Sequence, residues 1–171
     1  MSKRQILGTA LAAVIGAFAV AGVAQAESNN CGRPGTWFGA SDIGVTWLGV
    51  HTPGVNATVG QLDLAWTRGD STFNGQFPAG TELTHSRGIW EKVKAGTYKY
   101  THISYGRLNG APIYAMRISG RLVNTDCDHA TIGYKLEIFS PAATMDTGGA
   151  PVMAISGTGT ETRMQLTEVA P

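Results

Sequence analysis

Apolar and polar side chains alternate along most of the chain after residue 43. The segment 97–105 is the clearest case, because Tyr98, Tyr100 and His102 fall on one face of a strand with mostly polar side chains between them. No window keeps a helical period for more than about two turns. The pattern therefore predicts an all-β chain whose strands have one buried face and one face in water.

Segments rich in Val, Ile, Thr, Tyr and Trp are separated by Gly, Asn, Asp and Pro, which is typical of short strands joined by turns. Asn109-Gly110 predicts a two-residue hairpin turn. A bend is expected near Gly88, and Gly157-Thr158-Gly159 is expected to be a flexible link between the last two strands. The predicted strands are 45–50, 61–67, 81–93, 97–105, 113–123, 130–139, 152–156 and 160–167.

About eight antiparallel strands with one apolar face favour an up-and-down β-barrel, with a β-sandwich as the alternative. The stretches 70–80 and 142–150 are poor in apolar residues and are predicted to be loops. An eight-stranded barrel has an interior that side chains fill or that holds one small ligand.

The beginning of the chain has the layout of a secretory signal. Lys3 and Arg4 precede an uncharged apolar run at 6–23, and Ala24-Gln25-Ala26 predicts cleavage after Ala26. An uncleaved membrane anchor is the alternative. We therefore expect a signal peptide at 1–26 and a single domain at 27–171 that is periplasmic or secreted, with no stable membrane insertion after cleavage.

The balance of charged residues and the two cysteines indicate which partners and which compartment to expect. Cleavage would leave 11 basic against 12 acidic residues, which does not favour nucleic acid as a partner. Cys31 and Cys127 are the two cysteines of the chain, and such a pair in an exported protein predicts a disulfide. The pattern leaves the oligomeric state open.

Two stretches carry a resemblance to a known family. Gly35-Thr36-Trp37 resembles the Gly-x-Trp of the first strand in lipocalins and other calycin-like barrels, and the segments 87–90 and 96–101 are similar to a hairpin of lipocalin-like exported bacterial proteins. The resemblance implies that Trp37 is structural, closing one end of the barrel in a cation–π contact with Arg163. It also implies a calycin-like barrel that binds a small lipophilic molecule.

The sequence offers little support for other chemistry. The histidines lack the spacing of a metal site, and no Gly-x-Ser-x-Gly or phosphate-binding loop is present, so neither a cofactor nor a catalytic residue is assigned. The polar anchors expected inside the barrel are Tyr hydroxyls and His102. The residues expected to line the ligand cavity are Trp90, Tyr98, Tyr100, His102, Tyr114, Met116 and Tyr134.

Two further functions stay open at this point. One is a small-barrel isomerase or cyclase that resembles allene oxide cyclase and dirigent proteins, in which a Tyr or His of the cavity guides a reactive intermediate. The other is a structural or interaction module of the cell envelope, which an exposed apolar patch would favour.

Overall fold

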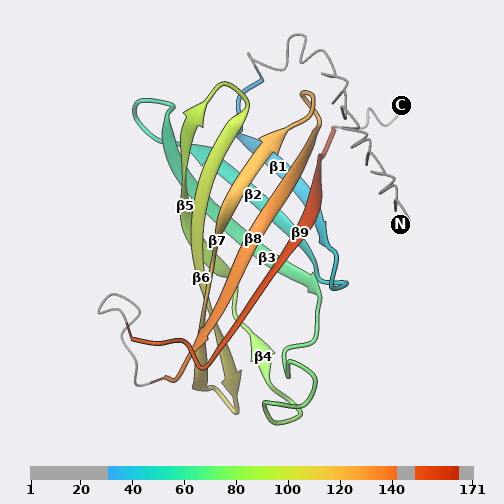
Figure 1. Cartoon of the computed structure of the whole chain (residues 1–171), viewed down its shortest axis with the longest axis vertical. Coiled ribbons are helices and arrows are strands. Elements are labelled where there is room, and N and C mark those ends of the chain that lie inside the picture. The colour runs from blue at the N-terminus through green and yellow to red at the C-terminus, as the bar shows by residue number, and fades with distance from the viewer. Residues whose placement is uncertain (1–30, 142–148, 166–171) are drawn as a thin grey trace, which may run out of the picture.

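Nine strands and no helix make up the part of the chain described by the structure, a computed structural model that covers residues 31–141 and 149–165 (Figure 1). The predicted signal peptide at 1–26, most of the predicted 142–150 loop and the end of the predicted 160–167 strand lie outside the described residues. Within the described residues there is no helix of the length and apolarity needed to cross a membrane. The strands are β1 (Gly35–Ser41), β2 (Thr46–Pro53), β3 (Val59–Arg68), β4 (Glu82–Leu83), β5 (Ser86–Lys94), β6 (Thr97–Leu108), β7 (Ala111–Asn124), β8 (His129–Phe139) and β9 (Met153–Arg163).

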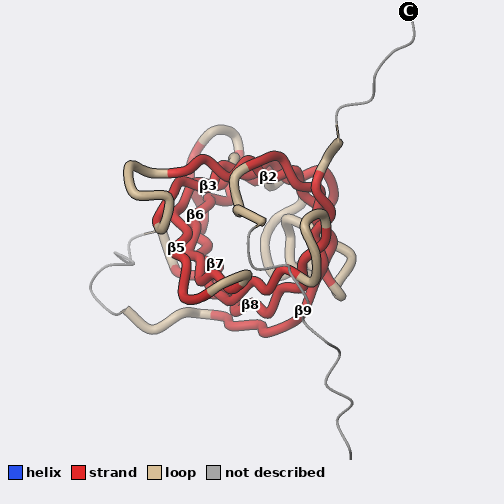
Figure 2. The backbone as a smooth tube through the Cα atoms, turned by 90° about the horizontal axis from the view of Figure 1, so that it is seen from above, coloured by secondary structure: helices blue, strands red, loops and turns tan. Residues whose placement is uncertain are grey.

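Eight of these strands close into an antiparallel barrel. Each strand of the series β1, β2, β3, β5, β6, β7, β8 and β9 pairs with the next, and β9 pairs with β1 to complete the ring seen end-on in Figure 2. The short β4 lies outside this ring and pairs only with the far part of β6. The predicted up-and-down barrel of about eight strands is therefore confirmed, and the sandwich alternative is not adopted.

Two details of the predicted strands are wrong. The segment 81–93 is divided into β4 and β5, so the interruption comes before Gly88 rather than at it. The glycines at 157 and 159 do not separate two strands, because β9 runs through them without a break. A Cβ at Gly157 would overlap with the Tyr134 ring, and one at Gly159 would crowd the Ala40 carbonyl. These glycines serve close packing rather than flexibility.

The alternation of strand directions gives the barrel two different ends. One end, here called the floor, carries the segment 31–34 and the turns at 54–58, 95–96 and 125–128 (upper end in Figure 1). The other end, here called the mouth, carries the turns at 42–45 and 109–110, the segment 69–85 and the connection from β8 to β9. Asn109 and Gly110 have φ values of 52° and 81°, which confirms the predicted hairpin turn.

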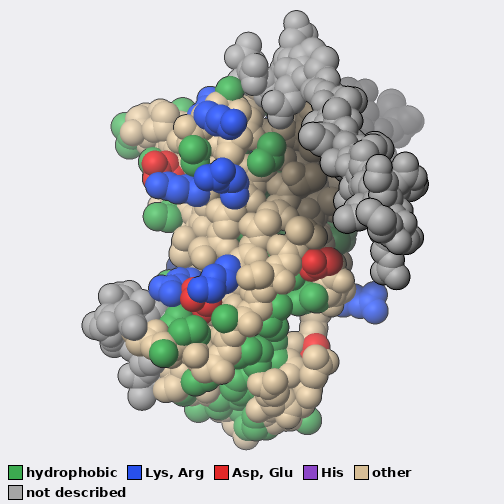
Figure 3. Space-filling view, in the orientation of Figure 1, with side chains coloured by type: hydrophobic (Ala, Val, Ile, Leu, Met, Phe, Trp, Pro, Cys, Tyr) green, Lys and Arg blue, Asp and Glu red, His purple; other side chains and the backbone are tan. Residues whose placement is uncertain are grey.

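The core of the molecule lies inside the barrel. Its floor half is built around Trp37, Trp47, Leu62, Trp90 and Tyr98, and its mouth half around Tyr114, Met116, Ile118, Leu136 and Ile138. Figure 3 shows basic and acidic side chains interspersed on the visible outer face, with hydrophobic side chains gathered toward the mouth. The alternation read from the sequence thus separates an apolar interior from a mixed polar exterior.

Candidate functional site

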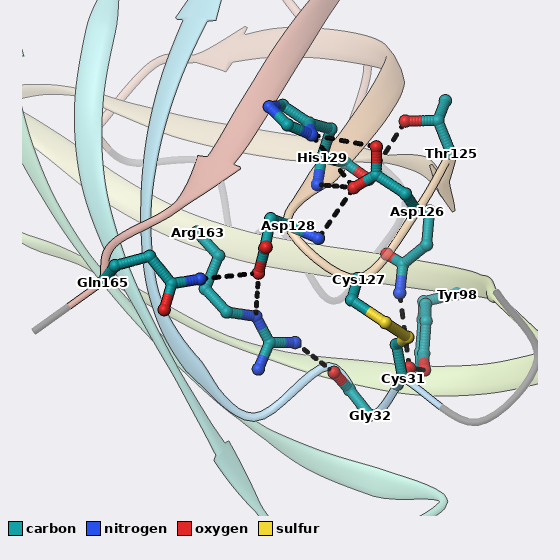
Figure 4. Close-up of a disulfide and its surroundings, with 11 residues drawn as sticks. Cys31, Gly32, Tyr98, Thr125, Asp126, Cys127, Asp128, His129, Arg163 and Gln165 are labelled. Carbon is teal, nitrogen blue, oxygen red and sulfur yellow. Dashed lines mark hydrogen bonds and ion pairs between the residues drawn. A yellow bond between two sulfur atoms is a disulfide. The ribbon is translucent and has the colours of Figure 1, made fainter.

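The segment 31–34 closes the floor by bonding to several strands at once. The Tyr98 hydroxyl of β6 and the Asn124 side-chain amide of β7 both donate to the Cys31 carbonyl at 3.4 Å. Nη2 of Arg163, at the end of β9, donates to the Gly32 carbonyl at 2.5 Å. Figure 4 shows Gly32, Tyr98 and Arg163 gathered around the disulfide. The segment is therefore held across the end of the barrel rather than hanging from β1.

The predicted disulfide between Cys31 and Cys127 is confirmed, with 5.1 Å between the two Cα atoms. Cys127 lies in the turn between β7 and β8. This turn is itself braced, because Asp126 accepts from the backbone N–H and the ring Nδ1 of His129 (Figure 4). The bond thus ties the floor segment to an ordered turn.

Two guanidinium groups flank the ring of Trp37 at the floor. The Arg163 Cζ lies 4.7 Å from the Trp37 ring centroid, so the structure places these two side chains in the contact that the resemblance implied. The Arg33 Cζ lies closer, at 4.0 Å, and the Trp37 indole N–H donates to the Arg33 carbonyl. The Arg33 side chain is fully buried, and sequence reasoning did not single it out.

A buried carboxylate balances the charge of Arg33. Nη2 of Arg33 forms an ion pair with Oε2 of Glu161 on β9, whose side chain is only 4% exposed. The other carboxylate oxygen accepts from Nε1 of Trp47 at 2.8 Å. Arg33 also contacts the His51 ring, with 2.9 Å between Nη2 and Nε2. Burial, followed by the charge of Arg33, lowers the pKa of His51 well below its usual value, so this ring is neutral.

A cavity of about 260 Å³ lies between this floor and the mouth. Its wall is mostly apolar and includes Leu62, Leu64, Met116, Ile118, Leu136 and Ile155. Asp70, Asn74 and Gln76 also line it, and these residues of the segment 69–85 are exposed to solvent. The cavity therefore reaches the surface at the mouth.

Four of the seven residues expected to line the cavity do so, namely Tyr100, His102, Met116 and Tyr134. They come from three consecutive strands, β6, β7 and β8. Side-chain alternation along each strand places them inside, because each has an even number in a strand whose even positions face inward.

The other three expected lining residues lie elsewhere in the interior. Trp90 and Tyr98 pack edge to face at 5.6 Å in the floor cluster, where Trp90 donates to the Gln61 carbonyl. Tyr114 is covered by Phe73 and Phe77, with ring centroids at 5.7 and 4.3 Å, and donates to a backbone carbonyl of the segment 69–85. Strand position alone does not distinguish these rings from those that face the cavity.

His102 is a buried polar group of the cavity wall, 4% exposed. Its ring lies between Trp66, at 6.0 Å, and Tyr100, at 5.8 Å and nearly parallel. Nδ1 of His102 lies 2.6 Å from the Ser86 hydroxyl. Burial lowers the pKa of His102 to about 3, so the imidazole is neutral at physiological pH. The predicted grouping of His102 with tyrosine rings is thus present, with one tryptophan added.

The two tyrosines of the wall differ in their hydroxyl partners. The Tyr134 hydroxyl donates to Asp42 Oδ1 at 2.9 Å, and burial together with that carboxylate raises the pKa of Tyr134 to about 12. The same Asp42 accepts from the backbone N–H of Thr158, which joins the β1–β2 turn to β9. The Tyr100 hydroxyl has no hydrogen-bond partner in the described ranges, and burial raises its pKa.

Sequence reasoning missed the acid and the imidazole at the base of the cavity, Glu161 and His51. A signal for Glu161 was available, because positions 161 and 163 share one face of a strand and Arg163 was expected to face inward. No comparable signal pointed to His51. In residues 31–141 and 149–165, no group of three or more His, Cys, Asp or Glu side chains is placed to hold a metal ion.

No protein-family model matches the chain, and no curated protein matches its sequence. The closed eight-stranded antiparallel barrel is consistent with a calycin-like fold.

Proposed function

We propose that this protein binds a small lipophilic molecule in its barrel cavity, as an exported lipocalin-like protein. The observation that carries the proposal is the cavity of about 260 Å³ with a mostly apolar wall and an opening at the mouth. A dry cavity of roughly 150 Å³ holds one benzene molecule. The present cavity therefore has room for two fused aromatic rings, whose transfer out of water is favourable.

Two features of the chain support the proposed export from the cytoplasm. The disulfide between Cys31 and Cys127 suits an oxidising compartment outside the cytoplasm. The signal pattern at the start of the sequence suggests the same route. An isomerase or cyclase would use the same cavity, and ligand binding is the step that both functions share.

Equilibrium dialysis with naphthalene tests the proposal on the purified protein with its disulfide intact. Ile118 is buried in the cavity wall, so Ile118→Trp is expected to fill the space and weaken naphthalene binding at least tenfold. Ile89 points outward from β5 and is 59% exposed, so Ile89→Trp adds the same bulk without an effect on binding. Absence of saturable naphthalene binding, or equal binding by both variants, would contradict a cavity site.

Native mass spectrometry gives an independent measurement on protein purified from its own host. A co-purifying small molecule should be present in the wild-type protein and reduced in Ile118→Trp. A molecule retained equally by that variant would have to bind outside the cavity.

A further inference from the structure

The hydrogen bonds of Ser86 determine which nitrogen of His102 carries the proton. The Ser86 hydroxyl lies 2.9 Å from the Ile103 carbonyl oxygen, which can only accept, so the single hydroxyl proton is donated there. Ser86 Oγ is also 2.6 Å from Nδ1 of His102 and must accept in that contact. Only an N–H at Nδ1 satisfies both contacts. A neutral His102 therefore carries a bare lone pair on Nε2.

Nε2 of His102 has no hydrogen-bond partner in the part of the chain that the structure describes. The residue is 4% exposed and lines the cavity between Trp66 and Tyr100. An unpaired acceptor at the wall of an otherwise apolar cavity is therefore a binding position for a donor that enters with the ligand.

A second polar atom on the same strand complements this acceptor. Tyr100 lies two residues before His102 on the inward face of β6, and its hydroxyl is also unpaired within the described residues. The Tyr100 hydroxyl can donate to an oxygen whose own proton goes to Nε2 of His102. An alcohol or phenol group supplies both the donor and the acceptor that this pair requires, whereas an ether or ketone supplies only the acceptor.

The charges around the cavity oppose an anionic ligand. Arg33 is already paired with Glu161, and of these two residues only Glu161 belongs to the cavity wall. Asp70 adds a second carboxylate at the mouth. A carboxylate such as that of a fatty acid would therefore meet carboxylates and a lone pair, and none of the wall residues that the structure describes carries a cation to receive it.

We infer that the ligand is an uncharged lipophilic alcohol or phenol, and that its hydroxyl donates to Nε2 of His102 while the Tyr100 hydroxyl donates to its oxygen. This inference rests on the binding function proposed above. It adds the chemical class of the ligand and the atoms that recognise it.

Four naphthalene compounds with one skeleton test this class by equilibrium dialysis at pH 7. They are naphthalene, 2-naphthol, 2-methoxynaphthalene and 2-naphthoate. We expect 2-naphthol to bind about tenfold more tightly than 2-methoxynaphthalene, because the ether has no donor for Nε2 of His102. We expect 2-naphthoate to bind at least tenfold more weakly than the ether.

Two variants assign the preference to the imidazole. His102→Phe removes the acceptor and keeps an aromatic ring, so the tenfold preference for 2-naphthol over the ether should fall to about one, with naphthalene binding kept. Ser86→Ala keeps the imidazole but removes the hydroxyl that holds its proton on Nδ1, so both tautomers become populated. The preference for 2-naphthol over the ether should therefore shrink. The matched control is His85→Phe, because His85 is exposed and away from the wall, and it should keep the full preference.

Nitrogen-15 NMR of the imidazole gives a readout that does not depend on binding. The wild-type protein should show His102 as the Nδ1–H tautomer, and Ser86→Ala should show a mixture. A dominant Nε2–H tautomer in the wild-type protein would overturn the inference. Equal binding of all four compounds, or tightest binding of 2-naphthoate, would also overturn it and leave the cavity function standing. If none of the four compounds binds, both proposals fail.

Discussion

Replacing Arg33 by methionine tests whether the barrel floor depends on its buried ion pair. Arg33 is fully buried and Glu161 is 4% exposed. Methionine keeps much of the unbranched stem of arginine but has no charge to offer the carboxylate. Of the donors to Glu161 among the described residues, only the indole N–H of Trp47 would then remain. The variant therefore leaves a buried carboxylate without its cation.

The size of the effect follows from this burial. Removing one partner of a buried ion pair costs about 3–5 kcal/mol, because the remaining charge is neither solvated nor paired. The loss of the cation–π contact with Trp37 adds to it. A second change, Glu161→Gln, removes the stranded charge and keeps an oxygen that accepts from Trp47. The double variant Arg33→Met with Glu161→Gln should therefore recover at least about 2 kcal/mol relative to Arg33→Met alone.

Urea unfolding at pH 7, followed by tryptophan fluorescence with the disulfide intact, measures these free energies. The matched control is Arg87→Met, because Arg87 pairs with Asp63 at 3.5 Å on the outer surface, where the two side chains are 87% and 57% exposed. That change should cost less than about 1 kcal/mol. If Arg33→Met costs no more than the control, or if the double variant is as unstable as the sum of its single changes, the floor does not depend on this pair.

Two other predictions concern stability. A Cβ at Gly88 would overlap with the Thr101 carbonyl of the neighbouring strand, so Gly88→Ala should destabilise the protein by about 2 kcal/mol or more in urea unfolding. A Cβ at Gly133 would meet no neighbouring atom, so the control Gly133→Ala should change stability by less than about 1 kcal/mol. Because the pKa of His102 is lowered to about 3 in the folded state and is about 6.5 in an unfolded chain, the unfolded state binds the proton first and stability falls as the pH drops below about 6.5. His102 should therefore lower the free energy of unfolding by about 2 kcal/mol between pH 7 and pH 5, and this loss should be absent from His102→Phe. Identical profiles of unfolding free energy against pH for the two proteins would refute the prediction.

The alternation of apolar and polar side chains predicted most of the fold, because each strand of a barrel has one face in the interior and one face in solvent. It predicted β6, β7 and β8 with the correct residues inward. It did not predict β1, whose sequence is rich in glycine and small residues and has no clear period. The Gly-x-Trp resemblance supplied that strand instead. The glycines of β9 were read as flexible because a sequence does not show which neighbour a missing Cβ makes room for.

The site was predictable to the level of the strand face, but not to the level of depth along the barrel. Tyr98, Tyr100 and His102 share one face of β6, yet only the second and third of them line the cavity. Depth depends on which end of the barrel is filled by the segment 31–34 and by the aromatic residues of the segment 69–85. Both are segments without strand periodicity, so the alternation gave no information about where they pack.

The floor and the cavity are linked by one short segment of chain. Cys31 ties the segment to the turn beyond β7, and Arg33, two residues later, neutralises Glu161 at the base of the cavity. Without that cation, the carboxylate of Glu161 would be uncompensated. A neutral ligand in the cavity would then share the space with this charge or with the water that solvates it. Arg33 therefore belongs to the segment that closes the barrel floor and also neutralises a carboxylate that lines the cavity. This coupling explains why an arginine is buried beneath an apolar cavity, where a hydrophobic side chain would close the barrel but leave Glu161 unpaired.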